Sequence, residues 1–537
     1  KYILLHHQLK LRNFITMNQE FELIAKTFQG LEEVLAQELT ELGAEDIQIG
    51  NRMVSFSGDK AMMYKANFYL RTAIRILKPI KHFTATTADE VYNAVKDIAW
   101  EEYLDATNTF AVDSVIFSED FRHSKFVAYK VKDAIADYFR EKTGNRPSVR
   151  INNPDIQINI HIAENNCTLS LDSSGESLHR RGYRQEQVEA PLNEVLAAGI
   201  ILLTGWRGEC DLIDPMCGSG TIPIEAALIA RNIAPGVFRK EFGFEKWKDF
   251  NQELFDEIYN DDSQEREFTH KIYGYDNNPQ ANAIAQRNVK AAGVSKDIVL
   301  KIQPFQQFEQ PAEKSIIIMN PPYGERISSD DLLGLYEMIG ERLKHAFTGN
   351  DAWVLSYREE CFEQIGLKAS VKIPLFNGAL ECQLREYQIF NGKYKEFRAE
   401  NPEKGLKKEN AERPVRNRHH GEKVEYGKRE RRPRRDDERP RWNENGPRKY
   451  DERPKWRDED FRRNNDERPS LRTRKAGDGK EFTRERRSGF RNRDEFPNDR
   501  QRPDAEKEQK RIPAKRFIYM HKRHELDRQK DENNEQD

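Results

Sequence analysis

Residues 315–324, SIIIMNPPYG, are where the fold is easiest to recognise. The apolar run 316–319 indicates a strand that is buried on both faces, which is the pattern of a parallel sheet. Each of the two prolines that follow fixes its own φ and extends the residue before it, so the backbone leaves the strand as a stiff arm. The arm places the Asn320 side chain, the Pro321 carbonyl and the Tyr323 ring at the carboxyl end of the strand, where open α/β sheets bind ligands.

Two fixed acceptors beside an aromatic ring suit the binding of a planar exocyclic amine. The Asn320 side-chain oxygen and the Pro321 carbonyl can each accept one N–H of a base amino group, so that the nitrogen lone pair points toward an electrophile. The Tyr323 ring can stack on the same base. A proline-rich turn after a core strand is the alternative interpretation, and these residues alone do not exclude it.

A second motif, DPMCGSGT at 214–221, lies between a short predicted strand (211–214) and a predicted helix that runs to about Asn232. A strand, a glycine turn and a helix open a nucleotide-binding α/β unit, because residues without a Cβ let a ligand approach the backbone. The glycines do not follow the GxGxxG spacing and no lysine follows them as in a P-loop, which makes NAD and ATP poor candidates. Cys217 is interpreted as a small packing residue rather than a nucleophile.

The sequence after this motif repeats the α/β pattern. We predict strands at 271–275, 298–302 and 352–356, a helix at 331–347, and a hairpin at 367–390 that turns at Asn377-Gly378. The strand at 271–275 is followed by Asp276, whose carboxylate can accept hydrogen bonds from both hydroxyls of a ribose. These elements predict an α/β, Rossmann-like sheet whose last hairpin is antiparallel.

Residues 21–178 precede this sheet and are predicted to form two α+β units. The first has strands at 21–27 and 52–57 and helices at 30–42 and 59–77. The second has strands at 110–117, 155–162 and 167–171 and a helix at 125–142. Isoleucine alternates with polar residues along 155–162, and His161 on the polar face is interpreted as a solvated side chain rather than a ligand.

These motifs resemble those of a known family. NPPY at 320–323 is similar to the fourth motif, Asn/Asp-Pro-Pro-Tyr/Phe, of amino-methyltransferases that use S-adenosylmethionine (SAM), and DPxCGSGT resembles their first, SAM-binding motif. SGESLHRRGYR at 174–184 closely resembles the end of the RNA-binding THUMP module in one group of these enzymes, and APLNE at 190–194 continues the similarity. Over residues 21–397 the chain resembles the methyltransferases that modify the N2 amine of guanine in large-subunit ribosomal RNA.

The resemblance implies a class I methyltransferase sheet preceded by a ferredoxin-like/THUMP region, SAM as the cofactor, and the N2 amine of guanine in RNA as the acceptor, with 23S ribosomal RNA the first candidate. The implied catalytic residues are Asn320, Pro321 and Tyr323. The residues implied to bind SAM are Asp214, Pro215, Cys217, Gly218, Gly220, Thr221, Asp276, Asn277 and Gln303. The resemblance also implies RNA contacts by Arg180, Arg181 and Arg184, although a solvated connector between domains fits the composition equally well.

The chain is predicted to comprise five parts. Residues 1–16 are expected to be a non-native extension, because the chain does not begin with Met and Met17 precedes the first patterned segment. The others are a ferredoxin-like domain (17–79), a THUMP domain (80–184), the methyltransferase domain (185–397) and a basic, arginine-rich tail (398–537). Low hydrophobicity and three DERP repeats predict a disordered tail. Its arginines and aromatics suit contact with single-stranded RNA, and a purely solubilising tail is the alternative.

The charge distribution, the cysteines and the lack of a long apolar stretch limit the kinds of partner and site that this chain can have. The net charge of −2 hides an acidic body, 1–400, joined to a basic segment, 401–537. The five cysteines form no CxxC pair, which predicts free thiols in the reducing cytoplasm and no metal site. No stretch approaches the roughly 18 apolar residues of a membrane span. The partner implied by the resemblance is RNA, and the oligomeric state is left open.

Three alternatives stay open from the sequence. A transfer RNA guanine-N2 methyltransferase has a similar layout, and NPPY alone does not separate guanine N2 from adenine N6. A non-catalytic RNA-binding factor of ribosome assembly with a vestigial methyltransferase fold is the third. The intact motif residues argue against it; they are Asp214, Gly218, Gly220, Asp276 and Asn320.

Overall fold

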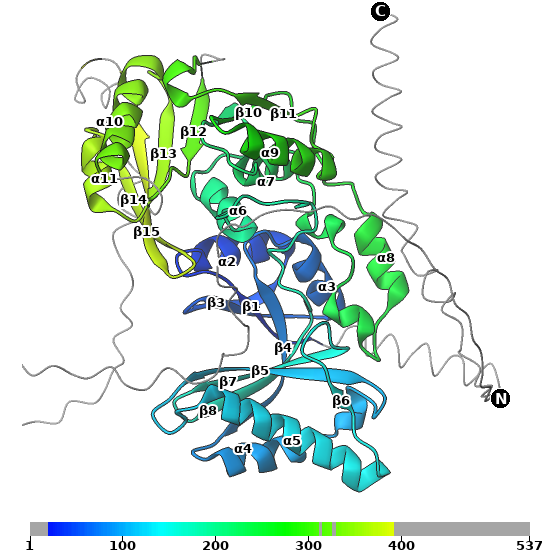
Figure 1. The fold of residues 1–537 in the computed structure, drawn as a ribbon. Helices are drawn as coiled ribbons and strands as arrows, with labels where there is room; N and C mark the ends of the chain where they lie inside the picture. Colours follow the sequence, from blue (N-terminus) through cyan, green and yellow to red (C-terminus); the bar gives the residue numbers. More distant parts are fainter. Residues whose placement is uncertain (1–19, 311–313, 325–328, 391, 393–537) are drawn as a thin grey trace, which may run out of the picture. The chain divides into compact units, whose positions relative to one another are not determined.

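The computed structural model of the chain describes residues 20–310, 314–324, 329–390 and 392 (Figure 1). All of these belong to one of the two units into which the chain divides. The other unit, 414–511, lies outside the described residues, as do the predicted N-terminal extension and the predicted tail. Those two predictions therefore stay predictions.

Within residues 20–310, the N-terminal part forms a mixed eight-stranded sheet in the order β2-β3-β1-β4-β8-β7-β5-β6. The strands are β1 (Phe21–Lys26), β2 (Glu45–Gly50), β3 (Met53–Gly58), β4 (Arg75–Thr84), β5 (Thr109–Phe117), β6 (Ser148–Val149), β7 (Ile156–Ala163) and β8 (Asn166–Asp172). The helices are α2 (Glu32–Leu42), α3 (Lys60–Tyr69), α4 (Ala88–Lys96) and α5 (Ser124–Thr143). Because β4 pairs with both β1 and β8, the predicted domain boundary at 79/80 lies inside a strand that both parts share.

The structure corrects one predicted helix. The pattern at 59–77 predicts a single helix, but α3 is followed by a turn and then by β4. The Glu38 carboxylate accepts hydrogen bonds from the backbone N–H groups of Arg71 (2.8 Å) and Thr72 (3.0 Å), which hold the turn after the helix. This long-range contact cannot be read from local apolar spacing. The strand β2 was not predicted, because its sequence EDIQIG is mostly exposed and carries little apolar pattern.

Among the described residues, the catalytic part forms a seven-stranded sheet in the order β11-β10-β9-β12-β13-β15-β14. The strands are β9 (Asp211–Asp214), β10 (Ile272–Asp276), β11 (Ile298–Ile302), β12 (Ser315–Met319), β13 (Asp351–Ser356), β14 (Val371–Asn377) and β15 (Leu380–Gln388). The helices are α6 (Glu194–Leu203), α7 (Thr221–Ala230), α8 (Gln252–Asn260), α9 (Pro279–Ala291), α10 (Ser329–Ala346) and α11 (Glu359–Gln364). Strands β9 to β13 are parallel to their neighbours in the group, and β15 is antiparallel to β13 and β14. The predicted Rossmann-like sheet with an antiparallel hairpin is confirmed.

The strand β12 lies in the middle of this sheet, as its apolar sequence predicts. All five of its residues are buried, and it pairs with β9 on one side and β13 on the other. From β9 the strand order continues to β10 and β11 in one direction and to β12 and β13 in the other. The order therefore reverses between β9 and β12, and open α/β sheets bind ligands at the carboxyl edge of such a switch point.

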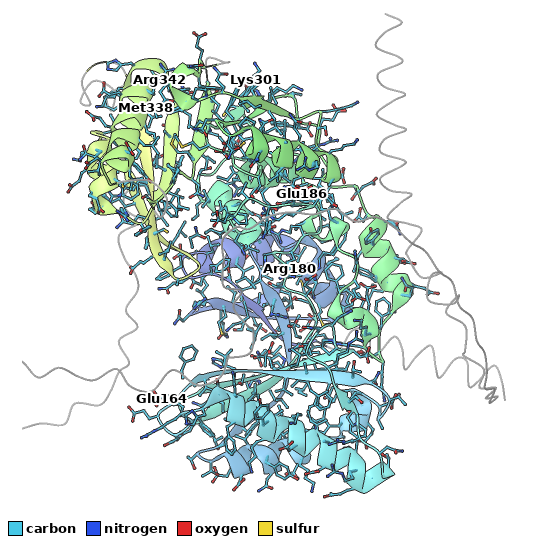
Figure 2. All side chains as sticks on the ribbon, viewed as in Figure 1. Glu164, Arg180, Glu186, Lys301, Met338 and Arg342 are labelled. Atoms are coloured by element: carbon cyan, nitrogen blue, oxygen red, sulfur yellow. The ribbon has the colours of Figure 1, made fainter. Side chains whose placement is uncertain are left out.

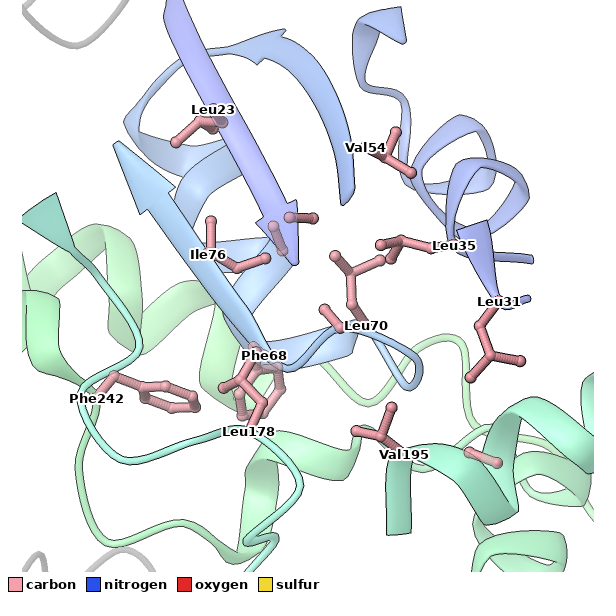
Figure 3. Close-up of a cluster of buried hydrophobic side chains, with 14 of the residues drawn as sticks. Leu23, Leu31, Leu35, Val54, Phe68, Leu70, Ile76, Leu178, Val195 and Phe242 are labelled. Atoms are coloured by element: carbon pink, nitrogen blue, oxygen red, sulfur yellow. The ribbon is translucent and has the colours of Figure 1, made fainter. Parts of the chain in front are cut away.

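A shared hydrophobic cluster joins the N-terminal sheet to the helices of the catalytic part (Figure 3). It includes Leu31, which precedes α2, together with Val195 of α6. A Cβ on Gly199 of α6 would lie 2.6 Å from the Leu31 side chain, so a larger residue there would have to displace that side chain. The inserted segment before α8 adds a second contact, in which the Phe244 ring stacks on Tyr64 of α3 with ring centroids 4.3 Å apart.

Candidate active site

Three polar residues stand at one edge of the catalytic sheet. Asp214 ends β9, Asp276 ends β10, and Asn320 directly follows β12. Because β9 pairs in parallel with both β10 and β12, the carboxyl ends of the three strands are neighbours. The structure thus brings together residues that lie far apart in the sequence, at the edge where the strand pattern predicts a ligand.

The glycine turn between β9 and α7 has two residues in the left-handed region, Gly218 (φ 53°) and Gly220 (φ 82°). A Cβ on Gly220 would lie 3.2 Å from the Ala285 Cβ on α9, so glycine lets the turn pack against that helix. Among the residues that the structure describes, a Cβ on Gly218 would meet only a Val188 methyl, at 4.0 Å. The Gly218 backbone is therefore open to close approach by a ligand.

Asp276 connects the loops that follow three strands, through its carboxylate and its backbone carbonyl. One carboxylate oxygen accepts the Gly218 N–H (2.9 Å) and the other accepts the Asn278 N–H (2.8 Å). The Asp276 carbonyl accepts the backbone N–H of Gln303 (3.0 Å). Asp276 is half-buried and Asn277 is exposed. Each carboxylate oxygen can accept a further bond, so the side chain is held in place and still able to bind ligand hydroxyls.

Several predicted site residues shape the turn from inside; Asp214, Pro215, Cys217 and Thr221 are buried. The Met216 N–H donates to the Asp214 carboxylate (3.2 Å), and burial raises the pKa of Asp214 well above its ordinary value. Burial, and then the nearby Asp214 and Asp276 carboxyls, also raise the pKa of Cys217, so the thiol stays protonated. This fits the interpretation of Cys217 as a packing residue.

Asn320 and Tyr323 lie together, but not as the sequence predicts. The Tyr323 hydroxyl donates a hydrogen bond to the Asn320 side-chain oxygen, the acceptor expected to hold a substrate amine. The Tyr323 ring meets the Tyr357 ring edge to face, with centroids 5.5 Å apart. Burial raises the pKa of Tyr323, so its hydroxyl stays a donor. In this arrangement the tyrosine orients the carboxamide instead of offering an open stacking face.

The arm that carries these residues is secured from behind. Pro321 is buried, and the Tyr336 hydroxyl of α10 lies within hydrogen-bonding distance of the Pro322 carbonyl (3.4 Å) and of Ser356 Oγ at the end of β13 (3.0 Å). The prolines and this contact restrict the arm, which is what a site that orients a small group requires.

Sequence reasoning missed two residues beside the arm, Tyr357 and Arg358. They directly follow β13, the neighbour of β12, and the Arg358 Nε donates to the Tyr357 hydroxyl (3.1 Å). A Cβ on Gly324 would lie 3.5 Å from the Arg358 guanidinium. The rule that selects Asn320, a polar group at the carboxyl end of a buried strand, would also have selected them.

Comparisons with known proteins agree with this geometry. Family models match three successive parts of the chain: an RlmL ferredoxin-like domain at 22–77, a THUMP domain at 85–172 and an RMKL-like methyltransferase domain at 181–386. A candidate RNA methyltransferase of Synechocystis sp., slr0064, is 39% identical over 369 residues, which are 68% of this chain and 96% of that protein. The chain belongs to the THUMP-containing, RlmL-like family of SAM-dependent RNA methyltransferases.

Two further relatives describe the match. The ribosomal RNA large subunit methyltransferase K/L of Syntrophotalea carbinolica is 39% identical over 404 residues, which cover 73% of this chain and 56% of that protein. This RlmL-like chain thus spans about half the length of that relative. The crystal structure of SMU.472, a candidate methyltransferase complexed with SAH, is 31% identical with a TM-score of 0.63 and covers 70% of this chain and 100% of that one. The predicted family and the SAM cofactor are confirmed.

The open turn of this RlmL-like methyltransferase fits SAM. Gly218 lets the cofactor approach the backbone, and Asp276 beside it can accept the ribose hydroxyls. The Gln303 side-chain nitrogen donates to the Gln307 carbonyl (2.7 Å), which orients the amide at the end of β11. The assignment of each residue to a part of SAM stays a prediction.

The three arginines of segment 174–184, which resembles the end of a THUMP module, do not share one role. Arg180 is exposed and pairs with Glu176 (2.6 Å), and it is labelled in Figure 2. Arg181 is only 2% exposed and lies against Glu225 of α7. The predicted RNA contact of Arg181 was therefore wrong, because its charge is enclosed in the interior. The Arg184 guanidinium also binds groups of this chain, among them the Glu194 carboxylate and the Ser219 hydroxyl.

Neither a metal-ion site nor a membrane-spanning helix is seen in the part of the chain that the structure describes. In that part, no cluster of three or more His, Cys, Asp or Glu side chains is arranged to hold a metal ion. No helix of the described residues has the length and apolar character needed to cross a membrane.

Proposed function

We propose that this RNA methyltransferase transfers a methyl group from SAM to the exocyclic N2 amine of a guanine, and that 23S ribosomal RNA is its substrate. The observation that carries the proposal is the placement of Asn320 and Pro321 at the end of β12, next to the glycine turn at the end of β9. A relative named for large-subunit ribosomal RNA supports the choice of RNA.

The residues of the arm bind and orient the amine. The Asn320 side-chain oxygen and the Pro321 carbonyl accept its two N–H bonds, so that the nitrogen lone pair is directed toward the cofactor. Bound SAM supplies an electrophilic methyl group on its sulfonium. The Asn320 side-chain oxygen has two lone pairs, so it can accept an N–H of the amine while it keeps the hydrogen bond from the Tyr323 hydroxyl. For the Tyr323 ring to contact the base, its side chain must move away from Tyr357.

The chain contributes orientation and exclusion of water rather than a covalent intermediate. A strong general base is not required, because a methylated, cationic nitrogen loses its proton readily. The buried thiol of Cys217 is protonated and takes no part. Asn320 should therefore be the side chain on which turnover depends most strongly.

Mass mapping of modified nucleosides tests the proposal. Ribosomal and transfer RNA from a deletion strain are compared with RNA from strains that carry the wild-type gene or the Asn320→Ala variant. We expect one N2-methylguanosine in 23S ribosomal RNA to disappear and to return only with the wild-type gene. Loss in transfer RNA would reassign the substrate, loss of N6-methyladenosine would reassign the base, and no loss at all would indicate a vestigial site.

A further inference from the structure

The helix α7 starts at the SAM-binding turn. Side chains from outside the catalytic sheet form hydrogen bonds and an ion pair with this helix and with the residues that follow it. Just beyond its end, the Arg71 guanidinium of the N-terminal part donates to the Ile233 carbonyl (2.9 Å) and to Asn232 Oδ1 (3.2 Å). At its middle, Glu225 accepts the Tyr183 hydroxyl (2.9 Å) and lies 3.5 Å from the Arg181 guanidinium. The segment that was expected to face RNA instead holds this helix.

Arg184 donates hydrogen bonds to the first residue of α7 and to the turn before it. One terminal nitrogen of its guanidinium donates to Ser219 Oγ (3.0 Å), and the other donates to Thr221 Oγ1 (3.0 Å) and the Leu192 carbonyl (3.2 Å). Its Nε donates to Glu194 (2.7 Å), the first residue of α6. These contacts use all three guanidinium nitrogens, and the Arg184 side chain is only 15% exposed.

Asn288 of α9 also holds the same turn. This side chain is fully buried, and its nitrogen donates to the Ser219 carbonyl (3.1 Å). Its oxygen accepts the backbone N–H of Gln185 (2.8 Å), the residue that follows Arg184. Ser219 is thus held by its hydroxyl and by its carbonyl, between two glycines that adopt left-handed conformations and, having no Cβ, restrict the backbone least.

We propose that Arg184 is a positioning residue for SAM: it fixes the Gly218–Gly220 turn in the shape that binds the cofactor, and it does not contact RNA. The proposal rests on the SAM-binding role of this turn and not on the choice of guanine or of ribosomal RNA. Glu194 balances the charge of Arg184 in the interior, so the pair can be buried next to the turn. A planar guanidinium reaches four acceptors at fixed angles, which a lysine ammonium cannot reproduce.

The test compares Arg184→Lys, Arg184→Ala and Ser219→Ala with an Arg180→Ala control. Arg180 carries the same charge four residues earlier, but its side chain is exposed, and among the described contacts its guanidinium pairs only with Glu176. SAM affinity is measured by calorimetry without RNA, RNA affinity by filter binding, and folding by thermal melting. Because no RNA is present in the calorimetry, an error in the proposed substrate would not alter its result.

We expect Arg184→Ala to weaken SAM binding about tenfold or more, from the loss of charge-assisted hydrogen bonds to the turn. Arg184→Lys should bind SAM with an affinity between those of Arg184→Ala and the wild type. Ser219→Ala should also weaken SAM binding, because it removes the contact between Arg184 and the turn. The KM for SAM should rise while turnover at saturating SAM is largely kept, and RNA affinity should stay unchanged in every Arg184 variant. Arg180→Ala should not alter SAM affinity.

Two results would overturn the proposal. The first is a folded Arg184→Lys or Arg184→Ala protein that binds SAM like the wild type. The second is a loss of RNA affinity with unchanged SAM affinity, which would return Arg184 to the RNA surface. If Arg184→Ala does not fold because Glu194 is left buried and unpaired, Ser219→Ala decides, since it keeps the Arg184–Glu194 pair. Wild-type SAM affinity in that variant would also contradict the proposal.

Discussion

The exchange Asn320→Ala tests the chemistry most directly. It removes one of the two acceptors that we assign to the target amine, while the other, the Pro321 carbonyl, belongs to the main chain and remains. Removal of a single preorganised polar group typically lowers the rate by about 10²–10³. This corresponds to about 2.7–4 kcal/mol in the activation barrier. Asn320 is half-buried rather than enclosed, so we expect the lower end, about 10².

The same exchange leaves the Tyr323 hydroxyl without its acceptor. Loss of that hydrogen bond should lower the free energy of unfolding by about 1 kcal/mol. The protein should therefore stay folded, and unfolding would not account for a hundredfold loss of turnover. Tyr323→Phe is the matched control, since it breaks the same hydrogen bond but keeps both the ring and the carboxamide. Turnover should fall far less in Tyr323→Phe than in Asn320→Ala, and Asn320→Asp, which keeps an acceptor, should lie between them.

The assay is single-turnover methylation of the RNA substrate at saturating SAM, with SAM and RNA affinities measured separately. Both affinities should be nearly unchanged in Asn320→Ala, because the contact matters mainly as the nitrogen becomes tetrahedral. Full turnover in this variant would refute the reasoning, and NPPY would then be only a stiff turn. An equal loss in Tyr323→Phe would show that the hydrogen bond between the two side chains, and not the acceptor, is what matters.

Three further predictions concern the cofactor, the base and the tail. Asp276→Ala should weaken SAM binding by about 1.5–3 kcal/mol, since it removes a charged acceptor for the ribose together with the acceptor of the Gly218 N–H; unchanged affinity in a calorimetric titration would remove Asp276 from the site. Tyr323→Ala should weaken capture of the target base by about 1–3 kcal/mol if the ring stacks on it, measured with RNA that carries or lacks that base; equal weakening for both RNAs would point to a structural role. Removal of residues 398–537 should lower RNA affinity most at low salt, because that segment is basic; equal binding by both proteins at every salt concentration would leave the tail as a solubiliser.

The catalytic sheet could be predicted from the sequence because its signals are local. The apolar run of β12, the glycine turn after β9 and the hairpin at Asn377 each depend on neighbouring residues, and the structure has them in the predicted order. The helix predicted at 59–77 failed for the opposite reason. The turn that ends α3 is held by Glu38, far away in the chain, and no periodicity within the segment shows such a contact. The hydrogen bond between Tyr323 and Asn320 was missed because side-chain rotamers are set by packing, here against Tyr357.

The sequence could have shown which arginines of segment 174–184 are enclosed in the interior. The signal lies in the helices that pack against this segment and not in the segment itself. An arginine-rich stretch looks the same whether it faces RNA or the protein interior. The helices opposite it differ: Glu225 is the single charged residue of TIPIEAALIA, and Glu194 begins EVLAAGIILL. A carboxylate in an otherwise apolar, buried helix needs a cation or a hydrogen-bond donor in the interior, since an unpaired buried charge is strongly unfavourable. The partners are Arg181 for Glu225 and Arg184 for Glu194. Lone acids in apolar helices therefore indicate which arginines of a basic segment are enclosed, and here they leave Arg180 as the member of the segment that can still reach RNA.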